Sequence, residues 1–132
     1  MVNCTTNIEC FHRRSLDYII FDIAYWRHKA AILGDLISFL KPDLEFIYDV
    51  INRGDSVLVH CLAGAHMAGT AGIICLMHFQ GLMAQEAVGV AQSRRPFIEP
   101  IGDFRDLLNK CDSLVRDSEK KFVLEGKINC HP

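Results

Sequence analysis

Hydrophobic residues recur along this chain at spacings that predict alternating strands and helices. The segment Asp17–Ile23 is aromatic and β-branched and predicts a buried strand. Residues 24–34 are mixed in character and predict a loop that runs into a helix. Ser56–His60 is a short apolar run that predicts a second strand. With helical periodicity between the two runs, the order β-α-β predicts parallel strands joined by a right-handed crossover.

The remaining apolar positions repeat with helical spacing. Pro42 suits the first turn of the helix between the two strands, and Gly54 suits its carboxyl end. Residues 67–80 are apolar on nearly all sides, so we expect a central, buried helix that Gly81 ends. Two more amphipathic helices are predicted, one over 84–91 before Pro96 and one over 104–115.

This pattern predicts one α/β domain, a central, mostly parallel sheet flanked by helices, over residues 1–116. Residues 117–132 are polar and charged and are expected to form a weakly ordered tail. The net charge of −2 gives no indication of a nucleic-acid-binding protein. No apolar run reaches the roughly 18 residues of a membrane span, and the first residues do not resemble a secretion signal, so no membrane partner is expected.

The six cysteines are expected to be reduced thiols in the cell interior, in the cytoplasm or the nucleus. Cys4 and Cys10 lie near His12, but no second ligand pair has the usual spacing, so no metal site is expected.

The candidate chemistry lies in the segment that follows the second strand. A strand delivers Cys61 to its carboxyl end, small residues follow, and a helix is expected to begin near Met67. Successive amide N–H groups in such a loop can point inward as an anion site, reinforced by the positive end of the helix. The same field stabilises a thiolate, so Cys61 is expected to be a nucleophile. The expected phosphate-binding loop consists of Leu62, Ala63, Gly64, Ala65, His66 and Met67, with His60 hydrogen-bonded to it in support.

Two other loop types share part of this pattern. Gly64 and Gly69 have the spacing of a nucleotide-binding loop, but Thr70 follows and the lysine of that motif is absent. Rhodanese-type sulfur transferases also place a cysteine in an anion loop after a strand, and they remain an outside alternative.

The stretch Val57–Thr70 resembles the signature of dual-specificity protein phosphatases, in the cysteine-dependent protein tyrosine phosphatase superfamily. That signature reads His-Cys, five residues and Arg, with glycine third of the five. The likeness is strongest over Val57–Gly64 and extends more weakly through Phe46–Ile47 and Arg95–Pro100, so it covers most of residues 17–116. The family usually has a further strand or two before the segment that Val2–Thr5 resembles, so N-terminal edge strands are expected to be missing.

The resemblance implies hydrolysis of a phosphomonoester, such as a phosphotyrosine or phosphoserine/threonine protein, without metal or organic cofactor. Cys61 would attack phosphorus, and an aspartate would protonate the leaving oxygen and then activate water. The family carries this aspartate just past a strand, thirty to forty residues before the cysteine. Asp22 fits this description and is preferred, whereas Asp35 precedes apolar residues and is interpreted as a helix N-terminal residue.

Met67 departs from the signature, because it stands where the family has the arginine that clamps the phosphate oxygens. Protonated His66 turning inward, Arg94 or Arg95 reaching over from a later helix, or the backbone alone could compensate. Arg95 is kept as a supporting residue, although a solvated helix end is the simpler interpretation of both arginines. The sequence therefore predicts a phosphatase with impaired catalysis or, alternatively, an inactive pseudophosphatase that binds a phosphoprotein or another protein partner.

Overall fold

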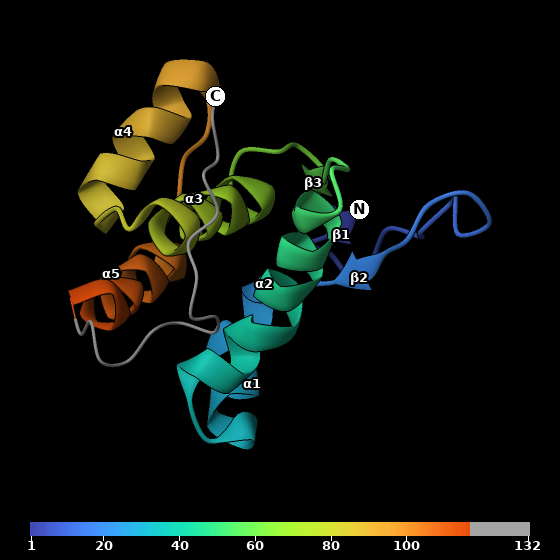
Figure 1. Ribbon diagram of the computed structural model, residues 1–132. Helices are drawn as coiled ribbons and strands as arrows, with labels where there is room; N and C mark the ends of the chain where they lie inside the picture. The colour runs from blue at the N-terminus through green and yellow to red at the C-terminus, as the bar shows by residue number, and fades with distance from the viewer. Residues whose placement is uncertain (117–132) are drawn as a thin grey trace.

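Three short parallel strands form the sheet of the computed structural model, which describes residues 1–116 of the chain (Figure 1). The strand β1 (Val2–Asn3) lies in the centre, with β2 (Ile19–Ile20) on one side and β3 (Val59–His60) on the other. Val2 is in register with both Ile19 and Val59. The prediction of an α/β fold with a parallel sheet is confirmed, and each of the two predicted strands pairs with β1, which lies between them. The predicted tail over 117–132 lies outside the described residues.

The segment Asp17–Ile23 is not the long buried strand that its composition predicts. Only Ile19 and Ile20 pair with β1, and Ile20 is 48% exposed because β2 is an edge strand with no neighbour on its outer side. Phe21 is buried, after which the chain turns into the 3-10 helix η1 (Ile23–Tyr25) and then into α1 (Trp26–Leu33).

The helix α2 (Leu36–Asn52) begins earlier than Pro42 predicts. The side chain of Asp35 accepts a hydrogen bond from the Ser38 amide at 2.6 Å, which satisfies one of the free donors of the first turn. Pro42 therefore lies inside the helix and not in its first turn, and the helix continues without the amide hydrogen that proline lacks. The carboxyl end agrees with the prediction, because Gly54 has a φ of 88° and its amide donates to the carbonyl of Ile51.

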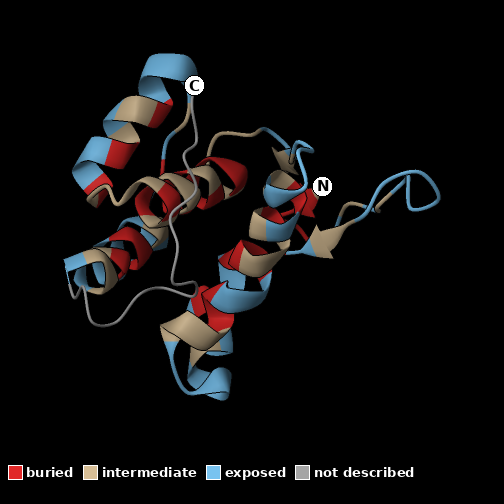
Figure 2. Cartoon of the chain, in the orientation of Figure 1, coloured by how far each residue is buried: buried red, intermediate tan, exposed pale blue. Residues whose placement is uncertain are grey.

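The second half of the chain is helical, as its periodicity predicts. The helix α3 (Met67–Gln80) is largely buried, ends at Gly81, and packs against β3, α4 (Ala84–Arg94) and α5 (Asp103–Arg116) (Figures 1 and 2). No single described helix is long and apolar enough to span a membrane; α3 and α4 pass such a test of length and composition only as a pair bent by 119°.

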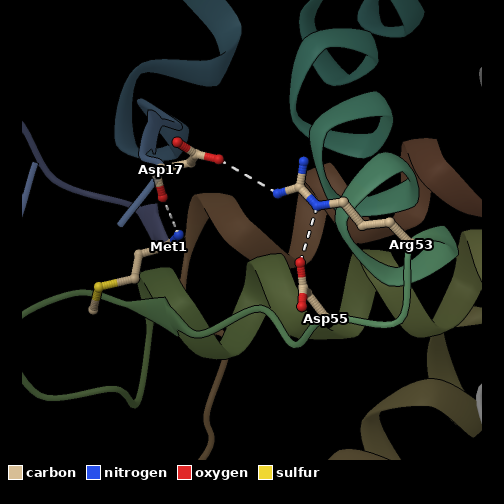
Figure 3. A network of polar contacts seen from close by, with 4 residues as sticks. All are labelled: Met1, Asp17, Arg53 and Asp55. Atoms are coloured by element: carbon tan, nitrogen blue, oxygen red, sulfur yellow. Dashed lines mark hydrogen bonds and ion pairs between the residues drawn. The ribbon is translucent and has the colours of Figure 1, made fainter. Parts of the chain in front are cut away.

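A polar network closes the end of the sheet opposite the candidate loop (Figure 3). The Met1 amino group donates to the carbonyl of Asp17, and Arg53 forms ion pairs with Asp17 at 3.4 Å and with Asp55 at 3.0 Å. These charged side chains are mostly exposed, so the pairs orient the chain more than they stabilise it.

One carboxylic acid is buried inside the apolar core. Asp43 on α2 lies beside Val2, Ile74 and Cys75, and its Oδ1 has no hydrogen-bond partner among the described residues. Burial raises the pKa of Asp43 from 3.8 to about 8, because a carboxylate in this apolar site would lose its hydration.

Asp43 should make the stability of the fold depend on pH. The pKa of Asp43 is higher in the folded chain than in the unfolded chain. The contribution of Asp43 to the free energy of unfolding is therefore complete below pH 3.8, the pKa in the unfolded chain, and is lost as the pH rises through about 8. Asp43→Asn removes the titration, and the variant should gain stability relative to the wild type as the pH rises, by at most about 1.4 kcal/mol per pH unit. Urea unfolding between pH 5 and 9 measures this difference.

Asp49→Asn provides the matched control, because Asp49 is exposed on the same helix. A pH profile that is the same for Asp43→Asn and for Asp49→Asn would contradict the prediction.

His78 affects the stability in the opposite sense. Burial lowers the pKa of His78 to about 4, so its contribution to the free energy of unfolding is lost as the pH falls.

Candidate functional site

The segment Cys61–His66 connects β3 to α3 at the carboxyl edge of the sheet. The parallel pairing of β3 with β1 brings Cys61 to this edge, and α3 begins at Met67, where the sequence predicts. The six residues of the expected phosphate-binding loop thus lie together, in a turn between a strand and the amino end of a buried helix. This is where open α/β sheets bind ligands, and the helix contributes partial positive charge.

The Cys61 sulfur is the centre of this loop. The amide of Gly64 donates a hydrogen bond to Cys61 Sγ at 3.1 Å, so the backbone curls back over the thiol. Gly64 has a φ of 76°, in the left-handed region that side chains rarely adopt, and this explains why a glycine stands at the turn. The Cys61 sulfur thus accepts a backbone hydrogen bond close to the amino end of α3.

A second cysteine lies beside Cys61 across the sheet. Asn3 is in register with His60, and the Cys4 amide donates to the carbonyl of His60 at 2.8 Å, so Cys4 and Cys61 leave adjacent strands together. Cys4 is fully buried, and burial, together with the charge of Cys61, raises the pKa of its thiol. Cys4 therefore stays neutral while the half-buried Cys61 reaches the surface. The sequence analysis missed this neighbour, because it did not pair the first strand with the third.

The segment that follows α4 packs against the loop. The Glu99 amide donates to the carbonyl of Ala65 at 2.8 Å, and the Glu99 carbonyl lies 2.7 Å from Nδ1 of His66. Ile98 covers Gly69 in the first turn of α3 so closely that a Cβ at Gly69 would lie 2.9 Å from Ile98 Cγ2. The His66 side chain is thus turned toward residue 99, and the segment Arg95–Glu99 packs along one side of the loop.

Arg95 caps the carboxyl end of α4 and is exposed to solvent, and its side chain also lies against the loop. A Cβ built on Gly64 would lie 2.9 Å from Arg95 Nη2, which means that the guanidinium contacts the turn directly. Its Cζ also lies 4.8 Å from the centre of the Phe97 ring, a cation-π distance. Of the compensating cations considered from sequence, Arg95 is the one that the structure brings into contact with Gly64.

His60 precedes Cys61, and Met67 is the last residue of the loop and the first of α3. Met67 is half-buried and packs against the hydrophobic core, so it supplies the loop with neither charge nor donor. His60 Nε2 is buried without a hydrogen-bond partner among the described residues, so this nitrogen does not make the bond to the loop that the sequence analysis expects.

Asp22 follows β2 at the same edge of the sheet. The amide of Phe21 donates to the carbonyl of Asn3, and η1 contacts α3, so the segment after β2 is held on the side where the loop lies. The Asp22 side chain is 20% exposed and lies 4.0 Å from Lys29 Nζ. Asp35 caps α2, as its interpretation as a helix N-terminal residue requires, which leaves Asp22 as the candidate acid. Trp26, which follows η1, is 2% exposed and belongs to the core.

Cys61 should be the most reactive described thiol. Cys10 is half-buried to a similar degree but lies outside the loop, whereas burial raises the pKa of Cys111 to about 12. Limited treatment with iodoacetamide at pH 6, followed by peptide mapping, should label Cys61 before the other described cysteines, Cys4, Cys10, Cys75 and Cys111. Equal labelling of Cys61 and Cys10 would show that the loop does not activate the sulfur.

The contact between Ile98 and Gly69 can be tested with two glycines of one helix. Gly72 also lies in α3 but has open space where a Cβ would be, so Gly72→Ala should stabilise the protein by about 0.5–1 kcal/mol. Gly69→Ala should instead destabilise it by about 1–3 kcal/mol, because the new methyl overlaps Ile98. Midpoints of urea unfolding give both values. If the two variants gain stability equally, residues 95–99 do not pack as described.

Comparison with known proteins agrees with this arrangement. Residues 1–113 match the family model of the dual specificity phosphatase catalytic domain. The chain is 32% identical over 82 residues to dual specificity protein phosphatase Mpk3 of Drosophila melanogaster, which covers 62% of this chain and 20% of that protein. It is 26% identical over 126 residues to human dual specificity protein phosphatase 9, which covers 96% of this chain and 32% of the relative. The matched region is therefore about a fifth and about a third of these two relatives.

A solved structure shares the fold. It is a mouse protein described as a dual specificity phosphatase, crystallised with zinc tungstate. The two structures superpose with a TM-score of 0.72 at 20% sequence identity, over 94% of this chain and 74% of the mouse chain.

Proposed function

Because the match over residues 1–113 shows that this chain belongs to the dual specificity phosphatase catalytic domain family, we propose that its Cys61 loop binds phosphomonoester groups and hydrolyses them slowly. The substrate is a phosphotyrosine or phosphoserine/threonine side chain of a protein, or a related phosphomonoester. The observation that carries the proposal is the hydrogen bond from the Gly64 amide to Cys61 Sγ, in a loop at the amino end of α3. A cysteine sulfur that accepts a backbone hydrogen bond beside an anion site is suited to nucleophilic attack on phosphorus.

The proposed reaction has two steps. The Cys61 thiolate attacks phosphorus and forms a sulfur–phosphorus bond, while the bond to the leaving oxygen breaks and Asp22 gives that oxygen a proton. Asp22 then takes a proton from water, whose oxygen attacks phosphorus, so that phosphate leaves and the thiolate returns. Lys29, 4.0 Å from Asp22, stabilises the carboxylate between the two steps.

Met67 sets the rate of this reaction. Arginine at this position would bind two phosphate oxygens and stabilise the charge of the transition state, and methionine does neither. Loss of one such donor costs about 3–4 kcal/mol, or a factor of about a hundred to a thousand in rate. We therefore propose that binding by the backbone amides is retained and that turnover is slow.

The alternative is a pseudophosphatase that binds a phosphoprotein or another protein partner without turnover. The packing of Met67 against the core favours this alternative, because the side chain serves stability in a position where catalysis needs a charge.

The two functions can be separated by hydrolysis of p-nitrophenyl phosphate. Met67→Arg should raise kcat/KM by about a hundred- to a thousandfold, because the new guanidinium reaches the phosphate oxygens. Cys61→Ser should abolish turnover, and Asp22→Asn should lower kcat more than KM changes.

Circular dichroism must first show that each variant is folded. Folded Met67→Arg that is as inert as Cys61→Ser would contradict the idea that Met67 alone limits the reaction. Calorimetric titration of Cys61→Ser with a phosphotyrosine peptide then tests the pseudophosphatase. Binding would support this alternative, and the absence of any heat of binding at millimolar peptide would exclude it.

A further inference from the structure

The loop lacks a cation of its own, yet a guanidinium lies against it. Residue 67 is methionine, and His66 is engaged with the carbonyl of Glu99 at 2.7 Å. Arg95 instead contacts Gly64, the residue whose amide binds the Cys61 sulfur. Standard bond lengths around Gly64, with the contacts on either side of it, place Arg95 Nη2 no more than about 9 Å from Cys61 Sγ. This upper limit puts the guanidinium and a phosphoryl group at the sulfur in the same neighbourhood.

Arg95 also differs from Arg27 and Arg53 in what it binds. Arg27 is engaged by Asp103 and Asp106, each at 2.7 Å, and Arg53 by Asp17 and Asp55. Arg95 is exposed and forms no ion pair with any residue in the range 1–116. Its charge is therefore not neutralised by a carboxylate and is open to an incoming anion.

The segment that carries Arg95 is fixed to the loop by its backbone. The amide of Glu99 bonds to Ala65, and the amide of Ile98 bonds to the Arg95 carbonyl, which closes a turn directly after α4. Stacking against Phe97 holds the plane of the guanidinium. A cation fixed in this way loses less conformational freedom on binding than a free surface arginine.

We propose that Arg95 binds the phosphoryl oxygens of a phosphomonoester at the Cys61 loop, in place of the arginine absent at position 67. This role rests on the proposed function, since it requires that the loop binds phosphate. It assigns the phosphate site two sources of donors that are distant in the sequence, the amides of the β3–α3 loop and the guanidinium that follows α4. The neighbouring Arg94 ends α4 and supplies a matched control.

Inorganic phosphate is the probe, and its protection of Cys61 against iodoacetamide is the measurement. At constant ionic strength, the phosphate concentration that halves the alkylation rate gives an apparent Kd without any turnover. Arg95→Met should raise this Kd by about ten- to hundredfold, the effect of losing a charged hydrogen-bonded partner. Arg95→Lys should raise it less, and Arg94→Met should change it by less than about twofold, because Arg95 and not Arg94 is the arginine found in contact with Gly64.

A second comparison separates binding from a role in loop shape. In Met67→Arg the phosphate has a new guanidinium, so adding Arg95→Met should then cost much less than it costs with Met67 present. An equal cost in both backgrounds would make Arg95 a positioning residue and overturn the proposal, as would equal Kd values for Arg95→Met and Arg94→Met. If phosphate does not protect Cys61 in the wild type, the proposed function itself fails, and this role with it. If phosphate protects Cys61 in Arg95→Met with the same apparent Kd as in the wild type, the function stands and only the role of Arg95 is lost.

Discussion

The pairing of β1 with two parallel neighbours is the constraint on which the rest of the structure depends. Val2 and Asn3 are fully buried, and their backbone groups bond to β2 on one side and to β3 on the other. Because all three strands run in the same direction, the segments that follow them leave at one edge. That edge therefore receives Cys4, Asp22 and Cys61 from three distant parts of the sequence. Without β1, the two outer strands would have no common partner. Asp22, the candidate acid, and Cys61, the candidate nucleophile, would then not lie at the same edge of the sheet.

A second constraint acts on the loop from outside the sheet. The hydrogen bond from Glu99 to Ala65 and the packing of Ile98 on Gly69 attach the segment after α4 to the amino end of α3. Such contacts keep the backbone amides of the loop in one arrangement, which is what an anion site built from the main chain requires. Methionine at position 67 adds no charge to this framework. The match over residues 1–113 shows the family, and the proposed turnover depends on which other group binds the phosphate.

Much of the fold could be predicted from the sequence, because helical periodicity and glycine ends are local signals. The buried helix over 67–80 and its end at Gly81 follow directly from such signals. The predicted start of α2 near Pro42 is wrong. The helix begins directly after its N-cap Asp35 and continues through Pro42. The exposure of β2 could not be read from its apolar residues, because an edge strand is defined by the neighbour it lacks.

The sequence predicts the loop residues of the candidate site but not the residues that pack against them. Cys61, the small residues of the loop and Met67 are contiguous, so their spacing identifies them. The contacts of Arg95 with Gly64, of Glu99 with Ala65 and of Cys4 with the Cys61 strand join residues about 30 to 60 positions apart, which only tertiary packing determines. In Arg95–Pro100, the resemblance marked the right segment without indicating that it lies along the loop.

The most direct test of this account is a crystal structure of the wild-type protein with tungstate, a tetrahedral oxyanion that resembles phosphate. The account predicts the anion in the loop next to Cys61, bound by amides of residues 62–67 and by the guanidinium of Arg95. An empty loop at saturating tungstate, or an anion bound elsewhere on the surface, would contradict it.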